Sequence, residues 1–290
     1  MNLDGYALPI KKLKGTDPVE SLDLSGKQLG VASTIVIASL ICVNGSLTSL
    51  DLSLNKLCGL DGYGQGTYTA DGITAIADAL RVNGSLTSIN MSGNYLTNFS
   101  RDMTGITELA AALGVNGALT ALDLSSNYLK DEGVSAVCEA IQSNKETKLV
   151  SLNFKNNEIG PVGANAVAAM VAATGSLTVT NLLGNHLDAE SAKMLSEVAK
   201  QKGISLCGIH RDQTTADFSR QKLKPPEAIL LASDLSQAGV TGSLTSLDLS
   251  NNELCGVTCW GGTYTGTYTA EGITAIADAL RVTGSLTKME

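Results

Sequence analysis

The chain has 290 residues, a net charge of −8, 43% hydrophobic residues and only 4% aromatic residues. The acidic balance argues against a nucleic acid as partner, because phosphate backbones attract basic surfaces. No apolar run is long enough to cross a membrane, and the first residues lack the apolar core of a signal peptide. The six cysteines show no disulfide-framework spacing, which is typical of a reducing compartment. We therefore expect a cytoplasmic protein that contacts neither nucleic acid nor membrane.

A leucine pattern organises most of the chain. Residues 1–18 form an N-terminal segment without a repeat, whereas residues 19–202 hold six copies of L-x-x-L-x-L-x-x-N-x-L. The pattern is clearest in the fourth copy, on Leu119, Leu122, Leu124, Asn127 and Leu129. Because side chains alternate along a strand, Leu122 and Leu124 predict a short strand with both leucines facing inward. The amide of Asn127 suits the turn that follows, where backbone groups need partners.

A helix is predicted after each of these turns. In the fourth copy it begins at Asp131 or Glu132. Its apolar side recurs at helical spacing on Val134, Val137, Cys138 and Ile141. Similar patterns predict helices over residues 31–41, 73–80, 106–113, 164–173, 189–200, 227–235 and 273–280. A strand–turn–helix unit cannot bury its apolar side alone but stacked copies can, so the sequence predicts an α/β solenoid.

A longer repeat overlies the short one. Two stretches recur: GSLTSLDLS at residues 45–53 and 242–250, and TA(D/E)GITAIADALRV at residues 69–82 and 269–282. We therefore assign residues 203–290 to a seam followed by a second, truncated block of leucine repeats. Within the seam, Ile204, Cys207 and Ile209 favour a strand. The last residues, 286–289, resemble an unfinished strand. We accordingly expect either a fragment or a chain that self-associates end to end.

Residues 19–290 resemble the ribonuclease-inhibitor-like subtype of leucine-rich repeats, on the LDLSxN motif and the amphipathic helix that follows it. The resemblance implies a leucine-rich-repeat solenoid curved into a horseshoe arc, with the parallel β-sheet on the concave side and helices on the convex side. It also implies a protein partner, because members of the family mostly bind other proteins, and some regulate Ran-type GTPases. The departures are Lys27, Asp212, Gln221 and two glycine-rich insertions.

The concave face can be inferred from the residues between the inward leucines. Its middle column is mostly Asp or Asn and includes Asp51, Asp123 and Asp248. One interpretation is an acidic binding surface for a basic partner; the other is a solvated ladder that keeps the sheet soluble. Lys155, Val179 and Leu183 interrupt the polar columns and mark repeats five and six as a candidate contact patch.

The two insertions, residues 58–70 and 255–270, collect aromatic residues. They carry Tyr63, Tyr68, Trp260, Tyr264 and Tyr268. Exposed Tyr and Trp on glycine-rich loops are typical of partner contacts, although packed loops that cover helix ends are the alternative. Both insertions follow the same motif position, so we expect them to leave the solenoid on the same edge. Cys255 and Cys259 lie close enough for a thiol pair or a loop disulfide.

The polar residues of the repeats favour structure over chemistry. We expect the motif asparagines to be buried and fully hydrogen-bonded; they are Asn55, Asn94, Asn127, Asn157, Asn185 and Asn252. Asn44, Asn83 and Asn98 begin triplets of the glycosylation type, which carry little weight without a secretion signal. The two histidines, His186 and His210, have no nucleophilic partner in sequence. No residues suggest a cofactor or metal.

We therefore predict a non-enzymatic protein-binding scaffold that acts through the insertions and the acidic concave face. A GTPase regulator is the first alternative, and it would need an exposed arginine directed at a nucleotide site. Arg81, Arg101, Arg220 and Arg281 are the candidates for that role. An architectural segment of a longer repeat array is the second alternative.

Overall fold

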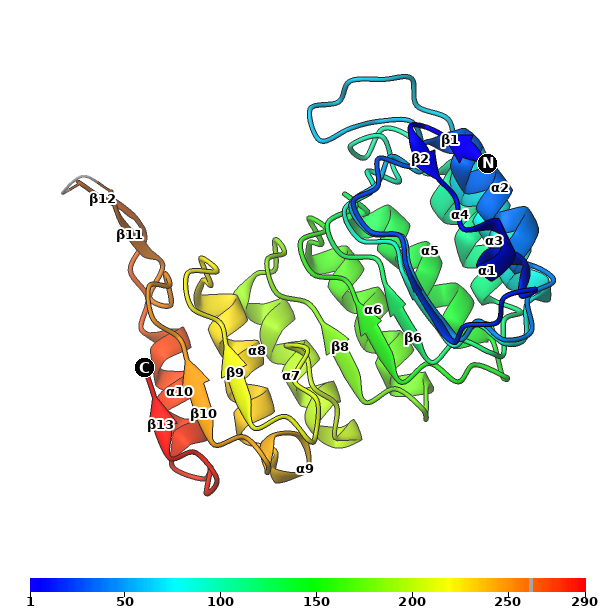
Figure 1. The fold of residues 1–290 in the computed structure, drawn as a ribbon. Coiled ribbons are helices and arrows are strands. Elements are labelled where there is room, and N and C mark those ends of the chain that lie inside the picture. Colours follow the sequence, from blue (N-terminus) through cyan, green and yellow to red (C-terminus); the bar gives the residue numbers. More distant parts are fainter. Residues whose placement is uncertain (261–262) are drawn as a thin grey trace.

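The computed structural model describes residues 1–260 and 263–290, apart from the side chains of Cys259 and Trp260. The chain forms an arc in which short strands line the inner side and helices cover the outer side (Figure 1). Six parallel strands form the first sheet in chain order, β3-β4-β5-β6-β7-β8. This arrangement confirms the predicted α/β solenoid.

The strands of this sheet are three residues long because each repeat supplies only one buried, inward-facing residue between two outward ones. They are β3 (Ser21–Asp23), β4 (Ser49–Asp51), β5 (Ser88–Asn90), β6 (Ala121–Asp123), β7 (Ser151–Asn153) and β8 (Val179–Asn181). In the register, Leu50 pairs with Ile89 and Ile89 with Leu122. Equivalent positions of successive repeats therefore form straight columns across the sheet.

The outer layer consists of helices at the predicted places. They are α2 (Val31–Ile41), α3 (Asp71–Val82), α4 (Thr104–Leu113), α5 (Lys130–Ser143), α6 (Pro161–Ala173) and α7 (Ala189–Lys202). Each packs on the next along the chain, and the core lies between them and the sheet. Leu122 and Leu124 are both buried in this core, as their alternation predicts.

The N-terminal segment covers the first repeat. It contains the hairpin of β1 (Asn2–Leu3) and β2 (Tyr6–Ala7), followed by α1 (Ile10–Lys14). Leu8 and Leu13 are buried against the core. The Asp4 carboxylate accepts the backbone N–H of Gly30 at 2.8 Å and so caps the start of α2. Residues without a repeat motif therefore protect the apolar end of the stack.

The second block forms a separate sheet. Its strands β9 (Thr215–Asp217), β10 (Ser246–Asp248) and β13 (Lys288–Met289) lie in the order β13-β10-β9. Its helices are α8 (Pro225–Leu235), α9 (Ala238–Thr241) and α10 (Glu271–Leu280). The second insertion, which the sequence indicated only as a glycine-rich loop, forms the hairpin β11 (Val257–Trp260) and β12 (Thr263–Gly266).

The strand predicted in the seam is wrong. Ser205 and Cys207 make only isolated bridges, to Val179 and Asn181 of β8. The segment turns away after this contact because Gly208 adopts a left-handed backbone, with φ of 78°. The first sheet therefore stops at the seam, although α7 still packs on α8 in the outer layer.

The motif asparagines form the predicted ladder beneath the turns. Asn127 donates to the carbonyl oxygens of Met91 and Leu124, and its own carbonyl oxygen accepts the N–H of Asn94. The members of the first block are buried and bonded in the same way: Asn55, Asn94, Asn127, Asn157 and Asn185. Asn252 makes equivalent bonds but is only half-buried. The prediction is confirmed for the first block.

A second asparagine ladder lies at the ends of the outer helices. Asn83 donates to the carbonyl oxygen of Ile41 at 2.6 Å, while its own oxygen accepts the N–H groups of Ser85 and Leu86. The buried members are Asn44, Asn83, Asn116 and Asn144. Two of them begin glycosylation-type triplets. Their side chains satisfy helix carbonyl groups and are buried in the folded chain.

Candidate protein-binding surfaces

The concave face of the first block holds a groove of about 450 Å³. Its floor is the polar middle column together with the serines beside it, and its far wall is made by Gly208 and His210 of the seam. The predicted contact residues Asp51 and Asp123 both line this groove. Asp248 lies in the separate sheet of the second block, in β10.

The aspartates of the middle column are partly committed to the backbone. One carboxylate oxygen of Asp51, Asp123 and Asp248 accepts the N–H two residues further on, at 2.8 Å in each case. This turn ends the strand, and Asn serves as well as Asp, which explains why the column holds only those two residue types. The second oxygens of Asp51 and Asp123 accept the amides of Asn90 and Asn153. The column is therefore both a structural ladder and a hydrogen-bonding surface.

The candidate contact patch of repeats five and six is wrong in two of its three residues. Val179 and Leu183 are buried, since the seam segment packs beside β8. Lys155 reaches across to the second block and donates to the side-chain oxygen of Gln221 at 2.7 Å. Burial lowers the pKa of Lys155. Lys155 therefore bridges the two blocks on the concave side.

An aromatic cluster of Tyr95, Phe99 and Tyr128 stands on the edge where the turns lead from strands to helices. The ring centroids of Tyr95 and Phe99 are 5.1 Å apart, as are those of Phe99 and Tyr128. These separations suit tilted aromatic pairs. All three residues are half-exposed. The cluster is a surface feature that the predicted site omitted.

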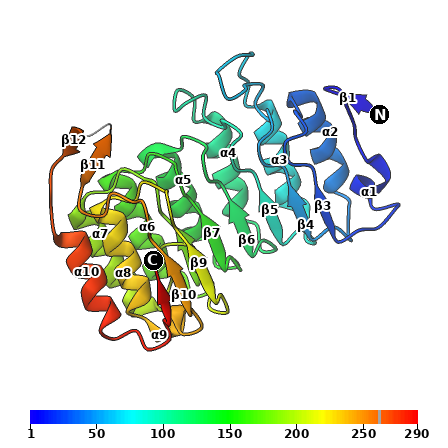
Figure 2. The same cartoon turned by 60° about the vertical axis from the view of Figure 1, so that its left-hand side comes forward.

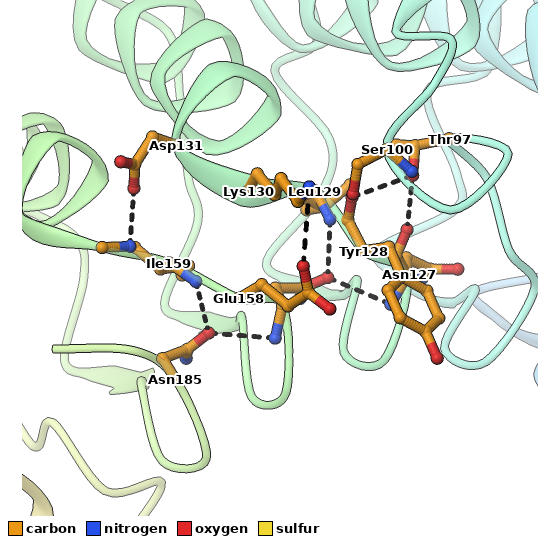
Figure 3. Close-up of polar contacts among 12 residues, drawn as sticks. Thr97, Ser100, Asn127, Tyr128, Leu129, Lys130, Asp131, Glu158, Ile159 and Asn185 are labelled. Atoms are coloured by element: carbon orange, nitrogen blue, oxygen red, sulfur yellow. Dashed lines mark hydrogen bonds and ion pairs between the residues drawn. The ribbon is translucent and has the colours of Figure 1, made fainter.

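The loop that carries Phe99 is held in an unusual backbone conformation. Asn98, Phe99 and Ser100 are left-handed, with φ of 50°, 53° and 66°, which disfavours residues other than glycine. Side-chain hydrogen bonds compensate: Ser100 Oγ donates to the carbonyl oxygen of Tyr128, and Thr97 Oγ1 to that of Asn127 (Figure 3). The fold thus fixes Phe99 against Tyr128.

The first insertion packs over this cluster. The Tyr68 hydroxyl donates to the carbonyl oxygen of Leu96 at 2.9 Å, and burial raises the pKa of Tyr68. Leu60 is buried. A Cβ at Gly62 would lie 2.8 Å from the Tyr95 hydroxyl oxygen, so only glycine fits there without a shift. Tyr63, by contrast, is 90% exposed. The packed alternative therefore describes the two ends of this insertion, whereas residues 62–67, which include Tyr63, are exposed.

The second insertion extends away from the solenoid as a hairpin (Figures 1 and 2). Tyr264 and Tyr268 are 74% and 69% exposed. The side chains of Trp260 and Cys259 lie outside the described residues. Both insertions leave the solenoid on the same edge, as predicted from their shared motif position (Figure 2).

The matched tyrosines of the two insertions give a direct test of the packing. Tyr68→Phe should lower the free energy of unfolding by about 1 kcal/mol, because the carbonyl oxygen of Leu96 loses its donor in a half-buried site. Urea unfolding followed by circular dichroism measures the change. Tyr268→Phe is the matched control and should leave the midpoint unchanged, since Tyr268 is exposed. Equal midpoints for the two variants would contradict the packed insertion.

Family comparisons agree with the repeat pattern and the solenoid. Models of the leucine-rich repeat match residues 118–138 and 145–168, and a further leucine-rich-repeat model matches residues 243–261. The chain is built of leucine-rich repeats. The matched segments include the strand and the first part of the helix of repeat four, and the corresponding strand of the second block. No curated protein matches the leucine-rich-repeat chain.

One solved structure shows the same fold at low identity. The leucine-rich repeat-containing protein LegL7 from Legionella pneumophila is 19% identical, with a TM-score of 0.51 over 99% of this chain and 88% of that chain. This likeness concerns the fold alone. A chain of the yeast Rad7–Elc1 complex is 17% identical, with a TM-score of 0.44 over 93% and 62% of the two chains. Actin-binding site 2 of leiomodin-1 is 16% identical, with a TM-score of 0.37 over 67% and 87%. Both of these TM-scores are too low to indicate a shared fold.

The described part of the leucine-rich-repeat chain offers no cluster of three His, Cys, Asp or Glu residues for a metal ion. In the same residues, no helix is long and apolar enough to span a bilayer. The sequence did hold a signal for the aromatic cluster that was missed. Tyr95 and Tyr128 each follow a motif asparagine in successive repeats, so the columns of the sheet bring them together.

Proposed function

We propose that the protein is a non-enzymatic scaffold of the ribonuclease-inhibitor-like subtype, and that it binds a protein partner through its insertion edge and concave groove. The observation that carries the proposal is the exposure of Tyr63, Tyr264 and Tyr268 on one edge of a chain with few aromatic residues. Large exposed aromatic side chains contribute more to protein interfaces than other residue types do. The half-exposed aromatic cluster adds to the same edge.

The concave groove supplies the polar part of the proposed interface. The half-exposed carboxylates of Asp51 and Asp123 keep their second oxygens on its floor, and the net charge of −8 favours a basic partner. Lys155 and Asp248 would contact a partner that extends across the seam. End-to-end self-association stays a proposal, supported by Ile273 of α10, which is 47% exposed although its counterpart Ile73 is buried.

A cytoplasmic location agrees with the state of the thiols. The free cysteines described are Cys42, Cys58, Cys138, Cys207 and Cys255. The GTPase-regulating alternative requires an arginine free to reach a nucleotide. Arg81 pairs with Asp78 and Glu108, and Arg281 pairs with Asp278. Arg101 and Arg220 are exposed and take part in no ion pair among the described residues, but no nucleotide-directed motif surrounds them. We prefer the scaffold because the exposed aromatic residues support it directly.

The proposal is tested by affinity capture from the source cell, followed by binding measurements with the captured protein. Tyr264→Ser combined with Tyr268→Ser should weaken binding at least tenfold, because exposed aromatic anchors are lost without effect on the core. Asp51→Asn should weaken binding less than the double tyrosine variant does, and it should reduce the salt dependence of binding. Glu139→Gln, which removes an exposed charge on α5 outside both proposed surfaces, is the matched control. Full binding by the double tyrosine variant would exclude the hairpin as a contact.

A further inference from the structure

The seam forms the far wall of the concave groove. Ser205 and Cys207 pair singly with β8, and the next strand, β9, belongs to the other sheet. Gly208 and His210 then line the groove. This wall therefore lacks the regular strand ladder that holds the floor of the groove, and other contacts must fix its position.

A buried carboxylate holds this wall from behind. Asp234, on α8, is fully buried. One of its oxygens accepts the N–H of Leu206 at 2.8 Å, and the other accepts the N–H of Cys207 at 3.0 Å and the hydroxyl of Ser205 at 2.7 Å. Ser205 Oγ in turn accepts the N–H of Ile209 at 2.9 Å. Two hydrogen bonds in series, from Ser205 to Asp234 and from Ile209 to Ser205, thus connect the carboxylate to the residue before His210.

The matching position of the first block shows that this carboxylate is a departure from the repeat. Alignment of DFSRQKL at residues 217–223 with DLSGKQL at residues 23–29 places Asp234 on Leu40. Leu40 is half-buried and packs against the core. A charged group has therefore replaced an apolar one at the helix that faces the seam.

We propose that Asp234 is a pH-dependent latch, which positions the Gly208–His210 wall of the concave groove through Ser205 and Ile209. Its effect on a partner rests on the proposed function, because the wall matters only if the groove binds. Asp234 is a positioning residue, since it touches the wall from inside and lies out of reach of the groove.

The direction of the switch follows from burial. Burial raises the pKa of Asp234 to about 6, and the N–H and hydroxyl donors lower it only in part. An exposed aspartate has a pKa of about 3.9. The latched state therefore takes up a proton more readily than an opened state in which Asp234 meets water. The latch holds best below the unshifted pKa and weakens as the pH rises through about 6, when the buried group becomes charged.

Among the described residues, no positively charged group faces Asp234 to stabilise its ionised carboxylate. Burial raises the pKa of the Cys207 thiol well above its ordinary value and also raises the pKa of Glu227 on α8. Thr241 of α9 donates a hydroxyl to the backbone oxygen of Asp234, and Ser196 of α7 accepts the hydroxyl of Ser233. The charged side chains of the nearby elements are exposed: Arg211 and His210 of the seam, Glu190, Lys193, Glu197, Lys200 and Lys202 of α7, and Glu271 and Asp278 of α10.

Amide hydrogen exchange on the free, full-length chain tests the latch. After correction for intrinsic rates, the opening equilibrium at Leu206 and Cys207 should increase about tenfold between pH 5 and pH 8, from the two pKa values of Asp234. The internal reference is the pair of amides at Leu129 and Ile159, which neutral asparagines hold in the same way. Those two should show no such increase. A rise at the seam no larger than at the reference would overturn the proposal.

Two variants identify the titrating group. Asp234→Asn should remove the increase at the seam amides, because the amide oxygen still accepts but cannot ionise. His210→Gln should keep it; loss of the increase in this variant would assign the switch to the histidine and overturn the proposal. If Asp234→Asn does not fold, the pH profile of amide exchange in the wild-type chain decides. A midpoint near pH 6 supports the latch, and the absence of that midpoint overturns it. Since no partner is present, failure of the binding experiments would leave this result unaffected.

Discussion

Asn127→Leu should lower the free energy of unfolding by about 3–5 kcal/mol. The side chain is fully buried and serves four backbone groups: the carbonyl oxygens of Met91, Leu124 and Ser125, and the N–H of Asn94. Leucine has a similar volume but leaves these groups without partners, at about 1–3 kcal/mol for each one that water cannot reach. Urea unfolding of the variant and the parent measures the difference.

Asn252→Leu is the matched control for the asparagine ladder. Asn252 donates to the carbonyl oxygens of Phe218 and Leu249 in the same geometry. Because it is only half-buried, water can replace part of what is lost, and the effect should be clearly smaller. An unchanged midpoint for Asn127→Leu would remove the structural role assigned to the ladder.

Gly72→Ala should destabilise the protein by about 3 kcal/mol. Gly72 lies in the first turn of α3, where the helix passes closely beneath the preceding turn. A Cβ at this position would come within 1.9 Å of the carbonyl oxygen of Leu57. Neither backbone segment can yield without moving a helix or the asparagine ladder, so overpacking outweighs the higher helix propensity of alanine. Thermal unfolding and urea unfolding both measure the change.

Gly84→Ala is the control for this substitution. Gly84 is exposed, and a Cβ there would meet no atom within 4 Å. Its substitution should leave stability unchanged or raise it slightly, through the smaller conformational freedom of the unfolded chain. Equal stability of the Gly72→Ala and Gly84→Ala variants would show that α3 can shift away from Leu57 at little expense.

The sequence alone determined the architecture, because a solenoid is specified locally. Each repeat carries its own inward leucines, turn asparagine and helical apolar face, and neighbours contact only neighbours. The helix over residues 31–41 was therefore predicted to the residue. The buried ladder through Asn127 followed from the same local pattern, as did the shared edge of the two insertions.

The binding surfaces depended on contacts between repeats that no local pattern encodes. Phe99 meets Tyr128 only because a left-handed loop and the column spacing bring them together. Tyr68 is held in place because its hydroxyl donates to the carbonyl oxygen of Leu96 in the following repeat. Its counterpart Tyr268 has nearly the same neighbours in sequence and is exposed. Nearly identical local sequences thus gave two different environments.

The seam shows the same limit most clearly. Residues 204–209 alternate like a strand, yet only isolated bridges form. Asp234 reads as an exposed charge in a helix, yet it is buried and accepts three hydrogen bonds from a segment nearly thirty residues away. Local sequence determines which residues a repeat can bury against a neighbouring repeat. Where two blocks meet without a matching repeat, only the tertiary structure decides which polar groups replace the missing ladder, because their partners are distant in sequence.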